Sequence, residues 1–117
     1  IGSQFYSFEF KPESFKQEIS SCRTFCLYEE LIALNKRGLI KGGSLDCAVV
    51  VKENGVVNKE KLRFPNEMVR HKVLDLIGDL SLVGNYFSAH VIAIRSGHSS
   101  NVALAKEIFN TFKMENC

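Results

Sequence analysis

The most regular hydrophobic pattern in the chain runs from Asn66 to Gly84, NEMVRHKVLDLIGDLSLVG. Because a helix advances about 100° per residue, each side chain in this stretch can be assigned to one side of the axis. One side is apolar and consists of Val69, Val73, Leu76, Ile77 and Leu80. The other side carries His71, Asp75, Gly78 and Leu82. The pattern predicts a helix with one face in the core and one face available for chemistry.

The chain before residue 28 predicts three short elements. Residues 4–10 alternate polar and aromatic side chains, which is typical of a strand. Pro12 favours the first position of a helix, and Phe15 with Ile19, four residues apart, would give that helix a small apolar face. Residues 20–27 are β-prone but polar in the middle, so we expect the end of a strand that carries functional groups.

A second short helix is predicted next, followed by a buried strand and a hairpin. Acidic residues stand at the start of this helix and basic residues at its end, as the helix dipole favours. Leu27, Leu31 and Leu34 form its apolar stripe. Residues 48–51 read as a buried strand, and Asn54-Gly55 is a strong hairpin signal.

The last third of the chain predicts a strand and a helix. Residues 85–94 alternate loosely between apolar and polar side chains, which indicates a strand. Ser99 or Ser100 would cap the final helix after a glycine-containing turn. The side of this helix that we expect to be buried consists of Val102, Ala105, Ile108, Phe109 and Phe112.

Together these elements indicate an α+β fold in a single domain covering residues 1–117. We expect a two-layer α/β sandwich with a mixed sheet of about five strands and helices packed on one face. The strand, helix and strand of residues 24–51 form a compact apolar unit within it. That unit is either ordinary core or, if it projects from the main sheet, an apolar slot for a long chain.

Composition narrows the class of protein. The 117 residues are 45% hydrophobic and 24% charged, as in ordinary globular domains, which argues against disorder. The net charge of +2 is small and its lysines and arginines are spread out, which disfavours nucleic acid as a partner. We expect no transmembrane segment, since no apolar run reaches about 20 residues. The first residues do not resemble a signal peptide, so a cytoplasmic location with free thiols is expected.

The polar side of the central helix carries candidate chemistry. His71 and Asp75 are one helical turn apart, and Asp79 is one turn further. An imidazole and carboxylates at this spacing could bind zinc, although an ordinary surface pair has the same spacing. Gly78 would allow something to approach the helix backbone closely. His98, on a loop before a helix, would complete a set of three ligands with water as the fourth.

Four segments resemble the second half of the bacterial zinc-dependent UDP-3-O-acyl-N-acetylglucosamine deacetylase of lipid A biosynthesis. The resemblance extends in order over nearly the whole chain, and the pattern VRHKxxDxxGDL is its most specific part. The four segments are SCRTF at 21–25, KGGSLDCAVVV at 41–51, LRFPNEMVRHKVLDLIGDL at 62–80 and SGHSSN at 96–101.

The resemblance implies a role for each matching residue. His71 and Asp75 resemble two of three protein ligands to a catalytic zinc. His98 matches the family's catalytic histidine and not a ligand, with Asp79 as the carboxylate that orients it. Thr24 matches the hydroxyl that helps to bind the oxyanion. Residues resembling contacts to the sugar and diphosphate of the substrate are Lys72, Phe25 and Arg95, the last replacing a lysine that is usual in the family.

For residues 24–51, the resemblance favours the apolar slot for a long chain over ordinary core. In the family this segment is a βαβ insert that holds the fatty acyl chain of the UDP-linked, acylated N-acetylglucosamine substrate in a passage. The residues that we expect to face this acyl chain are Leu27, Leu31, Gly43, Ser44 and Val50.

One departure from the family is large. Its first half carries the third zinc ligand, a histidine, beside the glutamate that acts as general base, and no His-Glu pair precedes Phe25 here. We therefore expect this chain to be inactive without a first half on the same or another chain. The competing hypotheses are a nucleotide-sugar or lipid-binding module without catalysis, which would need no zinc, and a plain interaction domain.

Overall fold

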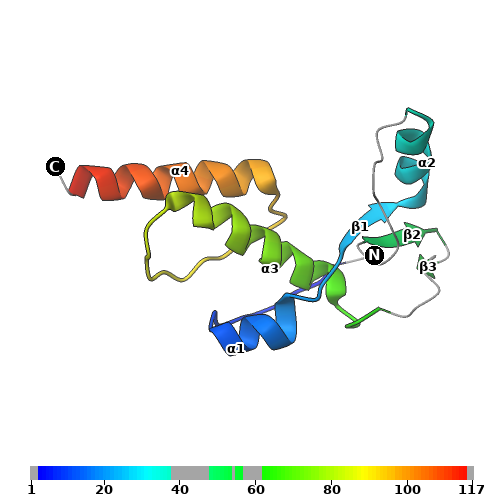
Figure 1. The fold of residues 1–117 in the computed structure, drawn as a ribbon, viewed down its shortest axis with the longest axis horizontal. Helices are drawn as coiled ribbons and strands as arrows, with labels where there is room; N and C mark the ends of the chain where they lie inside the picture. Colours follow the sequence, from blue (N-terminus) through cyan, green and yellow to red (C-terminus); the bar gives the residue numbers. More distant parts are fainter. Residues whose placement is uncertain (1–2, 38–47, 54, 57–61, 116–117) are drawn as a thin grey trace. The chain divides into compact units, whose positions relative to one another are not determined.

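The computed structural model describes residues 3–37, 48–53, 55–56 and 62–115, and it has the expected α+β fold (Figure 1). Within these ranges the secondary structure consists of helices and one mixed sheet of three strands. The chain divides into two compact units, residues 1–71 and residues 72–117. No helix among the described residues is long and apolar enough to cross a membrane.

The first unit begins with the short helix that the sequence predicts. Helix α1 (Pro12–Ser14) continues directly into the π-helical turn η1 (Phe15–Ile19). Pro12 occupies the start of the helix, where its missing N–H has no cost. The Ser14 hydroxyl accepts a hydrogen bond from the Lys11 backbone N–H at 3.1 Å and so caps the turn. Ile19 is fully buried and anchors this segment in the core of the unit.

The predicted strand–helix–strand unit and hairpin are both present. Strand β1 (Thr24–Leu27) leads into helix α2 (Tyr28–Lys36), and strand β2 (Ala48–Lys52) pairs with β1 in parallel, with Thr24 opposite Ala48. Strand β3 (Gly55–Val56) pairs with β2 in the antiparallel direction, as the hairpin signal indicates. Gly55 has a φ of 128°, which an L side chain rarely adopts, so glycine is suited to this turn.

Two segments predicted as strands have no strand pairing in the structure. Residues 4–10 and residues 85–94 are irregular, and several of their large apolar side chains are exposed, with Tyr86 fully accessible. The alternation of polar and apolar residues indicates which face of a strand each side chain would occupy. A strand also requires a neighbouring strand for its backbone hydrogen bonds. In the first of these segments Tyr6 instead donates its hydroxyl to Glu18 at 2.6 Å. The described residues therefore form three strands rather than about five.

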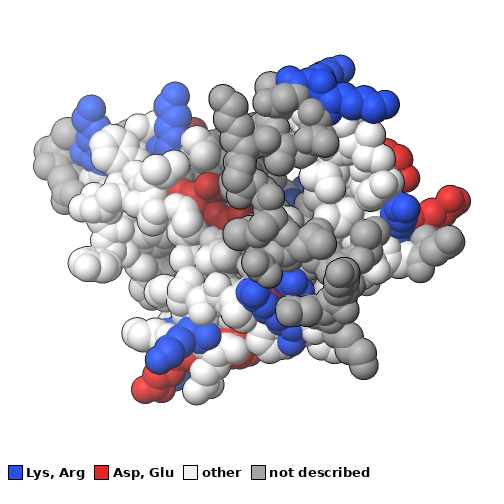
Figure 2. Space-filling model, turned by 45° about the vertical axis from the view of Figure 1, so that its right-hand side comes forward, with Lys and Arg blue, Asp and Glu red and all other residues white. Residues whose placement is uncertain are grey.

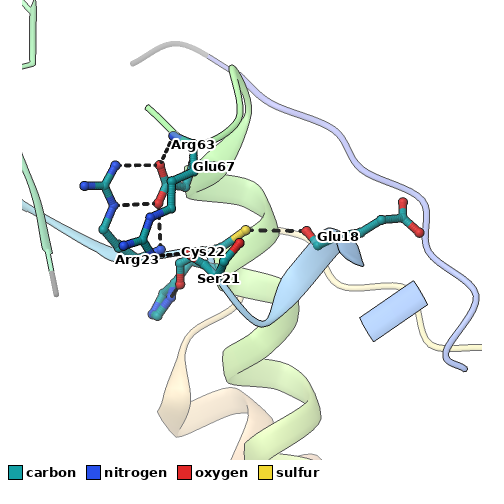
Figure 3. Close-up of polar contacts among 7 residues, drawn as sticks. Glu18, Ser21, Cys22, Arg23, Arg63 and Glu67 are labelled. Atoms are coloured by element: carbon teal, nitrogen blue, oxygen red, sulfur yellow. Dashed lines mark hydrogen bonds and ion pairs between the residues drawn. The ribbon is translucent and has the colours of Figure 1, made fainter. Parts of the chain in front are cut away.

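A buried ion pair joins the chain before β1 to the long central helix (Figure 3). Glu67, the first residue of helix α3 (Glu67–Leu80), is fully buried, and Arg23 is 5% exposed. The Arg23 guanidinium donates two hydrogen bonds to the Glu67 carboxylate, at 2.9 and 3.0 Å. The backbone N–H groups of Arg23 and Arg63 donate two more, at 2.8 and 2.9 Å. Four donors thus compensate the desolvation of one buried carboxylate.

The second unit has its own small core. Helix α3 ends at Leu80, the 3₁₀ turn η2 (Ser81–Val83) follows, and Gly84 closes the turn with a left-handed φ of 79°. The long helix α4 (His98–Glu115) then packs against this end. The buried cluster and the half-buried side chains packed on it are Leu80, Val83, Ala105, Leu76, Phe87, Val91, Ile108 and Phe112.

The inner face of α4 differs from the predicted one. Ala105 is buried and Ile108 and Phe112 pack on the core, as expected, but Val102 and Phe109 are 43% and 44% exposed. Asn101, which is 3% exposed, takes the inner position instead. The helix also starts earlier than predicted, at His98, and the Ser100 hydroxyl accepts a hydrogen bond from the Gly97 N–H at 3.1 Å. Ser100 therefore acts from inside the first turn.

The buried pair generates a stability prediction. Glu67→Gln should destabilise the first unit by about 3–5 kcal/mol, because the Arg23 guanidinium would remain buried without its counter-charge. Urea unfolding measures this loss. Glu9→Gln is the control, because the Glu9 side chain forms an exposed ion pair with Lys11 at 3.6 Å and its replacement should change stability by less than about 1 kcal/mol. Similar losses for both variants would contradict the prediction.

The buried pair of Arg23 and Glu67 also predicts how the stability of the first unit changes at low pH. Burial by itself raises the pKa of Glu67, but the hydrogen bonds from Arg23 and Arg63 outweigh it and lower this pKa from 4.5 to about 2. A lowered carboxyl pKa gives stability that is present above about pH 4.5 and is lost as the pH falls toward 2. Glu67→Gln should therefore reduce the slope of stability against pH in this window.

Candidate active site

The two predicted metal ligands lie one turn apart on α3, and both are half-buried. Nδ1 of His71 lies 2.9 Å from the backbone carbonyl oxygen of Cys22. Because a carbonyl oxygen can only accept, Nδ1 carries the proton and the lone pair of the ring is on Nε2. This is the tautomer of a histidine that binds a metal through Nε2 while its other nitrogen is held by a backbone group.

The described residues contain no group of three or more histidine, cysteine, aspartate or glutamate side chains positioned to hold a metal ion. His71 and Asp75 fit a metal site as two donors of suitable chemistry on one helix.

His98 is the first residue of α4, and its partners differ from those of His71. Its Nδ1 lies 2.7 Å from Oδ2 of Asp79, the carboxylate near the end of α3. The buried Asn101 side chain donates its amide N–H to the same oxygen at 3.1 Å. The imidazole is 70% exposed, whereas the carboxylate is 18% exposed. Asp79 is thus held in place by Asn101 and presents His98 to solvent.

The His98–Asp79 contact shifts both groups toward their charged forms. The hydrogen bond to Asp79 raises the pKa of His98, and the negative charges of Asp79 and Asp75 add to this. The hydrogen bond from His98 lowers the pKa of Asp79, and the Asn101 amide adds to that effect. A helix N-terminus disfavours a positive charge, so Asp79 acts against the dipole of α4. The arrangement favours an imidazolium whose Nε2–H points away from the carboxylate.

The predicted phosphate-binding residues lie in the second unit, near the start of α4. The Lys72 ammonium donates to the Ser96 carbonyl oxygen at 3.4 Å. Arg95 is exposed and has a φ of 50°, an uncommon left-handed conformation for a residue other than glycine.

The face in Figure 2 has lysine and arginine side chains interspersed with aspartate and glutamate.

The remaining predicted residues belong to the first unit, except for Gly43 and Ser44, which lie outside the described residues. Thr24 opens β1 and is exposed, and Phe25 follows it half-buried. Leu27 is 44% exposed at the end of β1, and Leu31 is half-buried on α2. Val50, in the middle of β2, is 2% exposed.

Sequence reasoning missed Asn101, Arg23 and Glu67. Asn101 could have been found, because it stands four, seven and eleven residues before Ala105, Ile108 and Phe112, on the same helical stripe. The sequence offers no local signal for the contact between Arg23 and Glu67, which are 44 positions apart. At Gly78, an added Cβ would meet no described atom within 4 Å, so no described part of the chain approaches it closely.

Comparison with known proteins decides the family. The family model described as LpxC, UDP-3-O-acyl N-acetylglycosamine deacetylase, matches residues 1–110. This chain belongs to that family. UDP-3-O-acyl-N-acetylglucosamine deacetylases of Chlamydia felis, Chlamydia abortus and Chlamydia pneumoniae are 59%, 58% and 56% identical to it over 92%, 97% and 97% of its length. The chain spans only 39–40% of the length of each of these relatives.

The geometry of this deacetylase-family chain predicts the titration of His98. Asp79→Asn should lower the pKa of His98 toward its ordinary value, because the charged hydrogen-bond acceptor that raises it is removed. The raised pKa implies stability that is present at low pH and lost as the pH rises through it. NMR titration of the ring protons measures the change, with the exposed His90 as internal control. An unchanged His98 titration would contradict the assignment.

Proposed function

We propose that this chain supplies part of the active site of an enzyme that hydrolyses the N-acetyl amide of UDP-3-O-acyl-N-acetylglucosamine in lipid A biosynthesis. The observation that carries the proposal is the His98–Asp79–Asn101 arrangement in a member of this deacetylase family. The relatives bear the name of this reaction, and their identity to the chain extends over nearly its whole length. A cytoplasmic location, as expected from the sequence, is part of the proposal.

In this mechanism His98 acts as the electrostatic stabiliser and general acid. Its Nδ1–H donates to Asp79, which leaves Nε2–H to donate toward the substrate. The imidazolium stabilises the oxyanion that develops when the amide carbonyl is attacked. When the carbon–nitrogen bond breaks, Nε2 gives its proton to the departing amine. Asp79 favours the charged form at the start of the cycle, and the Asn101 amide keeps its carboxylate oriented.

His71 and Asp75 are proposed as two ligands of a zinc ion. The tautomer set by the Cys22 carbonyl and the carboxylate one turn away suit this metal. When bound, zinc supplies a Lewis acid and lowers the pKa of a coordinated water. A third histidine ligand and a glutamate general base would come from the first half of the enzyme, beyond this chain. The 117-residue chain alone is therefore proposed to be inactive.

The substrate contacts follow from the chemistry of the remaining residues. Lys72 and Arg95 carry the positive charges that would bind the sugar or diphosphate. Thr24 would donate its hydroxyl to the oxyanion, and Phe25 would pack on the sugar. Leu27 and Leu31 support an acyl-binding surface on β1 and α2 because both retain exposed apolar area.

The test is a chimera in which this chain replaces the segment of the Chlamydia felis relative that it matches. His98→Ala should lower kcat for deacetylation by about 10²–10⁴-fold and leave zinc bound, because only the acid is removed. His71→Ala should instead lose zinc, and His90→Ala should change neither property. Assays of kcat and metal content measure these effects. Zinc loss from His98→Ala would contradict the assignment, and activity without zinc would favour a different chemistry.

The acyl surface has its own prediction. In the same chimera, Leu31→Asp should raise KM for a long-acyl substrate far more than for a short-acyl one, because a charge would be placed beside the alkyl chain. Leu104→Asp is the control, since Leu104 is 39% exposed on α4 and is not among the residues proposed to contact the acyl chain. Equal rises for both acyl lengths, or loss of folding by circular dichroism, would contradict the role of Leu31.

A further inference from the structure

One peptide group, the one that joins Cys22 to Arg23, is held at both ends by α3. Its N–H donates to Oε2 of Glu67 at 2.8 Å, and its carbonyl oxygen accepts from Nδ1 of His71 at 2.9 Å. A peptide group is planar and rigid, so these two bonds together fix its orientation. Glu67 and His71 are four residues apart and therefore lie on the same side of the helix. The helix thus contacts the same peptide twice, one turn apart.

The bond to His71 determines which ring nitrogen can bind a metal. With the proton on Nδ1, the lone pair of the imidazole is on Nε2. In metal sites this outer hydrogen bond also fixes the orientation of the ring, and its loss typically weakens metal binding by about 10- to 100-fold. The Cys22 carbonyl is part of the backbone, so its position depends on what holds the peptide.

Glu67 is placed to hold it. Figure 3 shows the carboxylate receiving both the Arg23 guanidinium and backbone N–H groups. A carboxylate that served only as the partner of a buried arginine would not need to accept the N–H of the peptide that faces His71. Hydrogen bonds to an ionised acceptor are the stronger kind, and a chain of hydrogen bonds polarises its members in the same direction. A carboxylate at the N–H end therefore strengthens the carbonyl at the other end as an acceptor.

We propose that Glu67 is a positioning residue for His71 and acts through the Cys22–Arg23 peptide, as a carboxylate–peptide–histidine relay. The relay fixes the tautomer and ring orientation of the metal ligand. This inference rests on the metal-binding role of His71 in the proposed function. Arg23 has a second role, because its guanidinium keeps the buried carboxylate compensated while its N–H transmits the contact.

The test uses two double variants of the chimera, Arg23→Met/Glu67→Gln and Arg23→Met/Glu67→Leu. Neither leaves an unpaired buried charge, but only glutamine keeps an oxygen that can accept the N–H of residue 23. Zinc affinity is measured by competition with a chelator. The leucine variant should lose about 10- to 100-fold in affinity, and the glutamine variant less than about tenfold.

The second readout is the tautomer of His71 in the zinc-free protein, measured by nitrogen-15 NMR. The parent and the glutamine variant should have the proton on Nδ1, and the leucine variant a mixture of tautomers. If the leucine variant does not fold, replacing the Cys22–Arg23 amide by an ester removes the same N–H without changing a side chain, and it should give the same loss.

The outcomes separate the two proposals. Equal zinc affinities and an unchanged tautomer in the leucine or ester variant would overturn the relay. A parent chimera that binds no zinc would overturn the proposed metal site, while the tautomer measurement would still decide whether Glu67 positions His71.

Discussion

The first unit depends on the buried carboxylate of Glu67. Burial alone would raise the pKa of this carboxylate, because it disfavours the charged form. Here the guanidinium of Arg23 and two backbone N–H groups compensate it, so the charge is retained. The consequence is a fixed connection between the start of β1 and the start of α3. Thr24 directly follows Arg23, whose backbone N–H donates to Glu67, and His71 lies one helical turn after Glu67 on α3. The carboxylate therefore sets the position of both residues.

The second unit positions its histidine by a different route. The stripe of Ala105, Ile108 and Phe112 holds the inner face of α4 against the core, and Asn101 is on the same stripe. Asn101 is thereby fixed, and its amide orients the carboxylate of Asp79. Asp79 in turn orients His98, which is itself largely exposed. An accessible imidazole can therefore have a defined orientation, because packing acts on it through two polar neighbours.

Local signals account for the part of this structure that the sequence predicts. Proline at a helix start, Asn-Gly between apolar runs and the apolar stripe of α3 each report on neighbouring residues, and the corresponding helices and hairpin are present. Residues 4–10 and 85–94 show why strands are harder, since pairing depends on a distant partner. The site residues show the same contrast between local signals and contacts with distant residues. The spacing of His71 and Asp75 is visible in the sequence, but the roles of both histidines came from the resemblance, and the contact of Glu67 with the peptide before β1 required the fold.

The two histidines differ in their partners, and this difference separates their proposed tasks. A carbonyl oxygen accepts the Nδ1–H of His71 and offers a dipole without a net charge. A carboxylate accepts the Nδ1–H of His98 and stabilises the imidazolium. A metal ligand must keep a lone pair on Nε2, whereas a general acid must keep a proton there. Both rings donate through the same nitrogen, so in this chain the proposed ligand and the proposed acid differ in the charge of the acceptor, a neutral carbonyl for His71 and a carboxylate for His98.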